Sequence, residues 1–203
     1  MQLSPVNIVL GANLRRRSQI SDGASSVILA RRAWAEKHGI KPLGRFIGTQ
    51  VAGCSPDEMG IAPVFAIPAL LKYAGVSIED IDIFELNEAF ASQTIYCIEK
   101  LQLDYTKVNP NGGAIALGHP TGATGARQTA TLLAELGKQD KEMGIVSMCA
   151  RYVCMLPSAD STNISSSSKH GNGGCFVVCP RVKMTFSMRF LAIISNETNY
   201  KSR

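Results

Sequence analysis

The chain has 203 residues, of which 45% are hydrophobic and 18% charged, and its formal net charge is +5. This length and apolar content fit one folded domain with additional segments and exclude a disordered composition. Charges of both signs alternate along the chain and the only dense basic run lies at 15–17, so we expect no nucleic-acid partner. No apolar run approaches the roughly 20 residues of a membrane span, so none is expected.

The cysteines and the chain ends bear on the compartment. No secretory apolar region opens the sequence, and the final Lys201-Ser202-Arg203 is not a peroxisomal signal of the Ser-Lys-Leu type. The cysteine spacing shows no compact disulfide framework, so we expect a reducing compartment. The residues alone are compatible with a cytoplasmic location. The six cysteines are Cys54, Cys97, Cys149, Cys154, Cys175 and Cys179.

Strand-like and helix-like segments alternate from about residue 18 to residue 149. This alternation predicts an α/β fold in which helices cover a mixed sheet. Apolar runs predict strands at 25–30, 46–52, 81–85 and 144–149, the first of them buried. Helical spacing with glycine or capping residues at the ends predicts helices at 31–38, 63–74, 88–101 and 122–136, and one turn at 78–80.

The alternation stops after Cys149. Residues 157–174 hold four consecutive serines and three glycines, a composition typical of a linker or of disorder. We therefore predict a divergent N-terminal segment at 1–17, a domain at 18–149 and a low-complexity or disordered, irregular tail at 150–203. A truncation at Met155 is then expected to leave the remaining domain equally stable.

The first informative motif is Asn-Glu-Ala-Phe-Ala at 87–91, where a buried-looking strand meets a helix. An asparagine in this place is most often a helix cap, because its side-chain oxygen accepts from free backbone amides. The alternative is that the Asn87 amide holds a water or a carbonyl oxygen at the sheet edge, where open α/β sheets place ligands.

The second motif is a glycine-rich run from Asn109 to Arg127, which presents His119 on a constrained loop. The glycines permit unusual backbone angles, and Pro120 stiffens the exit from the histidine. A helix beginning near Gly122 would direct amide groups at the loop, favouring an anion or lowering a nearby pKa. The alternative is a glycine-rich turn with one hydrogen-bonded histidine; dinucleotide and phosphate-loop patterns do not match.

The third motif is Ser-Met-Cys at 147–149, at the end of a predicted strand. A cysteine there is more often buried and inert than reactive. If Cys149 lies near His119, it can serve as a proton donor and acceptor, because an ordinary thiol pKa of about 8.5 is within tuning range of neutral pH.

In this order the three motifs resemble the signature set of the thiolase family. Ser-Asp-Gly-Ala at 21–24 and Met-Gly-Ile-Ala-Pro at 59–63 are also similar to that family. The similarity covers about two-thirds of the chain. The amino-acid sequences at 81–93 and 147–149 are most similar to the peroxisomal 3-ketoacyl-CoA thiolases of fatty-acid β-oxidation.

The resemblance implies a thiolase-like C-terminal domain and acetyl-CoA C-acyltransfer, or its reverse, the thiolysis of a 3-ketoacyl-CoA. It implies that His119 activates a nucleophilic cysteine and helps to bind the thioester oxygen, while Asn87 positions a water in that oxyanion site. It implies that Cys149 moves the proton at the α-carbon. Coenzyme A and acyl-CoA are then substrates, and no resident cofactor and no metal are expected.

Two departures from the family pattern matter. The family's nucleophilic cysteine lies in an N-terminal half that these residues do not match, and none of the six cysteines sits in its context. After Cys149 the family continues with a glycine-rich stretch into a final strand, but here Ala150-Arg151 follow, so that strand is expected to be lost. We therefore expect an incomplete domain, a fragment without independent turnover, because losing such a nucleophile costs on the order of 10⁶-fold.

Three hypotheses remain open. The first is an acyltransferase that is active when another chain supplies the N-terminal half, as a homodimer or with a full-length thiolase, in the peroxisome by resemblance. The second is a non-catalytic thiolase-like module that associates with full-length thiolase. The third is an unrelated α/β ligand-binding domain.

Overall fold

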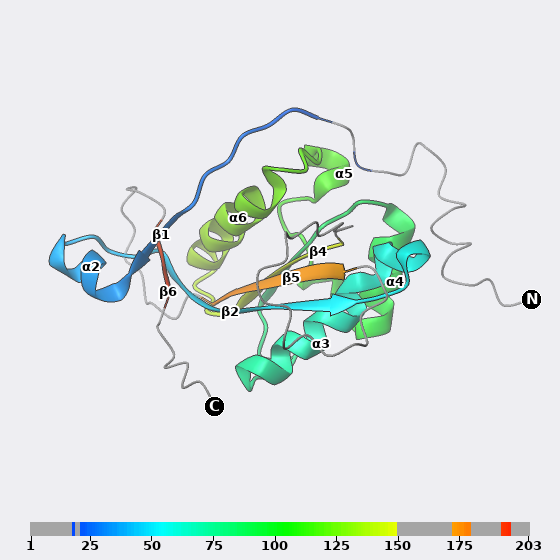
Figure 1. Ribbon diagram of the computed structural model, residues 1–203, viewed down its shortest axis with the longest axis horizontal. Coiled ribbons are helices and arrows are strands. Elements are labelled where there is room, and N and C mark those ends of the chain that lie inside the picture. Colours follow the sequence, from blue (N-terminus) through cyan, green and yellow to red (C-terminus); the bar gives the residue numbers. More distant parts are fainter. Residues whose placement is uncertain (1–17, 19–20, 150–171, 180–191, 196–203) are drawn as a thin grey trace, which may run out of the picture.

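The computed structural model describes residue 18 and residues 21–149, together with the backbone of two later strands at 172–179 and 192–195 (Figure 1). Its strands form one six-stranded sheet in the order β1-β6-β2-β5-β4-β3. The pairs β1–β6, β6–β2 and β4–β3 are parallel, whereas β5 is antiparallel to both β2 and β4, which confirms the predicted mixed sheet. The strands are β1 (Ile28–Arg31), β2 (Gly44–Gly53), β3 (Ile83–Leu86), β4 (Gly144–Met148), β5 (Asn172–Cys179) and β6 (Ala192–Ser195).

Helices cover both faces of the sheet, as predicted. In Figure 1, α5 and α6 lie on one side of β4 and β5, and α3 and α4 lie on the other. Within the described ranges, no helix is both long and apolar enough to cross a membrane. The helices are α2 (Arg32–Lys37), α3 (Ala62–Ala74), α4 (Ala91–Leu101), α5 (Ala114–Leu117) and α6 (Thr124–Lys138), with 3-10 turns η2 (Pro56–Ile61) and η3 (Tyr105–Lys107).

Alternate residues of β3 face opposite layers. Phe84 and Leu86 belong to the apolar cluster with α3 and α4, whereas Ile83 packs with Leu132 and Leu136 of α6. Because side chains alternate along a strand, Glu85 shares the face of Ile83 and is directed at α6. A charged residue thus occupies a core position on that face.

The expectation that the final strand is lost is wrong. Strand β5 lies between β2 and β4, and β6 lies between β1 and β2, so the predicted tail at 150–203 contains two strands of the sheet. The physical reason is that Cys-Phe-Val-Val-Cys at 175–179 has strong strand propensity, which outweighs the glycines before it. The other residues of that predicted tail, and the segment 1–17, lie outside the described residues.

The first predicted strand was expected to be buried, and this is also wrong. Ile28 and Leu29 of β1 expose 53% and 66% of their surface. The strand forms the edge of the sheet and pairs with β6 alone among the described strands, so its apolar side chains have few neighbours.

Candidate active site

The carboxyl ends of β3 and β4 place two of the three predicted site residues at one edge of the sheet. Asn87 directly follows β3, and Cys149 directly follows β4. The two strands are parallel, and the Asn87 backbone amide extends their pairing by donating to the Ser147 carbonyl at 2.9 Å. Parallel neighbours end at the same edge, which is where α/β sheets bind ligands.

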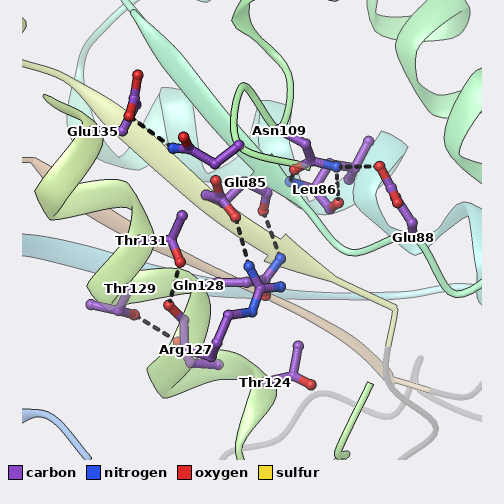
Figure 2. A network of polar contacts seen from close by, with 12 residues as sticks. Glu85, Leu86, Glu88, Asn109, Thr124, Arg127, Gln128, Thr129, Thr131 and Glu135 are labelled. Atoms are coloured by element: carbon purple, nitrogen blue, oxygen red, sulfur yellow. Dashed lines mark hydrogen bonds and ion pairs between the residues drawn. The ribbon is translucent and has the colours of Figure 1, made fainter. Parts of the chain in front are cut away.

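The glycine-rich loop is fastened to this edge by Asn109. Its backbone amide donates to the Phe84 carbonyl at 2.8 Å. Its side chain accepts from the Leu86 amide at 2.9 Å and donates to the Leu86 carbonyl at 2.8 Å, so one residue supplies the bonds of a neighbouring strand (Figure 2). The left-handed φ of 47° turns the chain into the loop at this point, a conformation that asparagine tolerates. The loop therefore begins beside Asn87.

Glu88 connects the same edge to α5. One carboxylate oxygen accepts from the Asn109 side chain at 2.9 Å, and the other accepts from the backbone amide of Ile115 at 3.1 Å. Ile115 lies in the first turn of α5, so the carboxylate satisfies an amide that a short helix leaves free. A side chain at Gly113 would collide with the Glu88 carboxylate, which explains a glycine in that position.

His119 follows α5 and is held at both ring nitrogens. Nδ1 lies 2.7 Å from the Thr124 hydroxyl, and Nε2 lies 3.5 Å from the side-chain amide nitrogen of Asn87. The Thr124 hydroxyl donates its one proton to the Pro120 carbonyl at 3.0 Å, so it accepts from Nδ1–H. This assignment leaves the lone pair on Nε2, facing Asn87.

The surroundings of His119 keep the ring neutral. Burial lowers the pKa of His119, and the positive charge of Arg127 lowers it further. The direction of the shift matches the lowering predicted near the loop, but its causes are burial and the charge of Arg127. A neutral imidazole whose Nε2 carries no proton is able to accept one at neutral pH.

The capping interpretation of Asn87 is wrong. Helix α4 begins at Ala91 rather than at 88, and its N-cap residue is Phe90. Asn87 is only 1% exposed, and its side-chain oxygen is buried with no hydrogen-bond partner in the described part of the chain. The side-chain nitrogen of Asn87 therefore faces His119, and its side-chain oxygen is an acceptor without a partner among the described residues.

Cys149 is placed near the site but is not bonded to its histidine. The side chain is 8% exposed, and among the described residues no hydrogen bond joins it to His119. Burial, with a smaller contribution from Cys54, raises the pKa of the Cys149 thiol to about 11. The thiol is therefore protonated at neutral pH, which suits a proton donor.

A buried ion pair beside the site was not expected from the sequence. Glu85 is fully buried, and its carboxylate lies 3.2 Å from Nη1 of Arg127 in α6 (Figure 2). Burial raises the pKa of Glu85 to about 7, against the opposing effect of Arg127. The available signal was a glutamate inside an otherwise apolar strand, which indicates a paired buried charge.

Comparison with known proteins gives the class of this fold and site. Residues 40–153 match the family model described as "Thiolase, C-terminal domain". The match covers more than half of the chain, which therefore belongs to the thiolase family, and the resemblance seen in the motifs is confirmed.

The particular relatives are 3-ketoacyl-CoA thiolases. The chain is 56% identical over 132 residues to the peroxisomal 3-ketoacyl-CoA thiolase of Saccharomyces cerevisiae, covering 65% of this chain and 31% of that protein. It superposes on the dimeric peroxisomal thiolase of the same yeast with a TM-score of 0.66 at 44% identity, covering 81% of this chain and 37% of the other. Human mitochondrial 3-ketoacyl-CoA thiolase in complex with CoA gives 0.66 at 37% identity, with coverages of 83% and 38%. The chain thus spans about a third of the length of these relatives.

Proposed function

We propose that this chain forms the acid–base and oxyanion side of a thiolase site that cleaves a 3-ketoacyl-CoA or, in reverse, joins two acyl groups. The observation that carries the proposal is the contact between the buried Asn87 amide and Nε2 of a neutral His119. The names of the relatives, which are 3-ketoacyl-CoA thiolases, support the substrate class.

His119 and Asn87 have complementary parts in this chemistry. The lone pair on Nε2 takes the proton of a nucleophilic thiol, and the resulting N–H then donates to the thioester oxygen. Asn87 retains a buried oxygen without a partner in the described residues, which is able to accept from a water beside that oxyanion. Oxyanion donors of this kind contribute on the order of 10²-fold each to the rate.

Cys149 has the remaining part. When the thiolate attacks the 3-keto carbonyl, the bond between the α- and β-carbons breaks and its electron pair stays on the α-carbon. The neutral Cys149 thiol then gives its proton to that carbanion, which yields acetyl-CoA. In the reverse direction the Cys149 thiolate removes the same proton.

The nucleophile itself belongs to the part of the family outside these 203 residues. We propose that a second segment or chain supplies it, and that the unit works as a dimer in the peroxisome, as the names of the relatives suggest. Coenzyme A and acyl-CoA are substrates in this proposal, and no resident cofactor takes part.

The test is complementation. The chain is purified, mixed with a separately produced N-terminal half of the yeast relative, and assayed for loss of acetoacetyl-CoA in the presence of CoA. We expect turnover in the mixture that His119→Ala abolishes. His38→Ala should leave it unchanged, because His38 is exposed and its ring, tilted against that of Trp34, lies outside the site. No turnover together with stable binding to an intact thiolase would favour the non-catalytic module instead.

A further inference from the structure

Glu85 and Asn87 lie two residues apart on the face of β3 and its extension that is directed at α6. Glu85 is fully buried there, where Ile83 and Val146 form the apolar layer with α6. A lone buried carboxylate in such a layer is costly, so a residue of this kind needs a partner and a reason to be retained.

The partner comes from the turn of α6 that also holds the histidine. Thr124, which accepts from the His119 ring, and Arg127, which bonds Glu85, are three residues apart and therefore lie on one face of the helix. The next residue, Gln128, donates from its side chain to the Glu85 carbonyl at 3.1 Å. Two bonds thus join the first turns of α6 to a single residue of β3.

We propose that the Glu85–Arg127 pair is a positioning device that holds the Asn87 amide against the His119 ring. Its two ends lie on the two elements that carry the contacting groups: β3 leads into Asn87, and α6 carries the Thr124 hydroxyl that orients the ring. Among the described residues, no hydrogen bond joins Glu85 or Arg127 to Asn87 or His119. Both therefore act through their neighbours.

One member of the pair, Arg127, also sets the charge that His119 experiences. Arg127 is the one charged group that lowers the His119 pKa, and Glu85 is the carboxylate nearest to that guanidinium in the described residues. The other ionised groups that act on Glu85 are Glu88, which is bonded to Asn109, and Glu135, which is bonded to Asn111. Burial raises the pKa of Glu85 to about 7, above the lowered pKa of His119, so Glu85 is mostly protonated where His119 titrates. The charge of Arg127 therefore acts on the ring without being neutralised, and removal of Arg127 should raise the pKa of His119, whereas removal of the Glu85 carboxylate should not change it through charge.

The experiment is an NMR titration of the three histidine rings in the full chain without substrate, with His119 assigned by its loss in His119→Asn. In Arg127→Met we expect the His119 titration midpoint to rise by at least about half a pH unit, because a nearby positive charge is gone. In Glu85→Gln we expect the midpoint to stay close to that of the wild type, because Glu85 is already mostly uncharged in the pH range where His119 titrates. In both variants the cross-peak between the Asn87 side-chain amide and the His119 ring should weaken.

The different responses separate the charge effect of Arg127 from general loosening, which would expose the ring and raise the midpoint in both variants. Lys138→Met removes a charge from the far end of the same helix and should leave the midpoint unchanged. If Arg127→Met does not fold, the double variant Glu85→Gln/Arg127→Met buries no lone charge, and its midpoint should lie above that of Glu85→Gln. A midpoint in Arg127→Met equal to that of the wild type, a rise of equal size in both single variants, or an unchanged Asn87–His119 cross-peak in both would overturn the proposal.

The inference rests on the proposed function only in one respect, which is that the proposed function makes the Asn87–His119 contact part of the catalytic site. Because the titration is read without turnover, an inactive chain would defeat the proposed function and leave this test intact.

Discussion

Asn109 holds the glycine-rich loop against the sheet, because its side chain makes the hydrogen bonds that a neighbouring strand would make beside the end of β3. The Asn109→Ala variant loses partners for the Leu86 amide and carbonyl, both buried, and for Glu88. We expect a loss of about 2 kcal/mol or more in the free energy of unfolding, measured by urea denaturation. Asn109→Gly permits the left-handed φ yet should lose a similar amount, because the bonds and not the backbone angle dominate.

The control for Asn109 is Asn111→Ala, which removes one hydrogen bond to Glu135 and should cost less than about 1.5 kcal/mol. A variant at Asn109 as stable as the Asn111 control would show that the loop is held by other contacts.

Cys149 should react slowly with thiol reagents despite its proposed part in proton transfer. Its thiol is 8% exposed and burial raises its pKa to about 11, so little thiolate is present at pH 8. We expect iodoacetamide labelling, followed by mass spectrometry, to accelerate as the pH approaches 11 and to remain faster at Cys149 than at the fully buried Cys97. Labelling of Cys149 no faster than that of Cys97 would remove support for a thiol that reaches substrate.

Glu85 makes the stability of the fold depend on pH. Its pKa is about 7 in the fold and about 4.5 when exposed, so between these values the folded chain binds the extra proton. The contribution is fully present below pH 4.5 and is lost as the pH rises through 7, by at most about 1.4 kcal/mol per pH unit. The urea midpoint should therefore fall from pH 5 to pH 8 more steeply in the wild type than in Glu85→Gln, and parallel curves would contradict this.

At the scale of elements, β5 reverses one expectation drawn from the sequence. It joins β2 to β4, so a truncation at Met155 removes the strand between two parts of the sheet. We expect this truncation to lose cooperative thermal unfolding, followed by circular dichroism, rather than to leave the domain equally stable. A chain that ends after Cys179 keeps β5 and should unfold cooperatively. Identical melting of the two truncations would contradict the position of β5 between β2 and β4.

Most helices and strands could be predicted because their apolar spacing is local. The start of α4 could not, since Asn87 to Phe90 would suit a helix but the Asn87 amide pairs with Ser147 of β4 and Phe90 is extended. Helix α5 was missed because it has four residues, and its first turn is capped by Glu88 from a distant part of the sequence. Tertiary partners overrode local preference in both cases.

At the scale of the whole molecule, the motifs were sufficient to predict the family and the adjacency of Asn87 and His119. They were insufficient for the order of the strands, since parallel and antiparallel pairs form between segments far apart in sequence. The ion pair between Glu85 and Arg127 was also beyond reach, because 42 residues separate its partners.

The place of β5 also has a consequence for synthesis on the ribosome. Strands β2 and β4 emerge well before the strand that separates them in the sheet, and β4 is complete at Met148 while β5 begins only at Asn172. Until Cys179 has left the exit tunnel, both strands present open edges to chaperones and to other nascent chains. Ribosome pausing before that point would lengthen the exposure, so codon choice upstream of β5 should influence how much of the protein reaches its folded state.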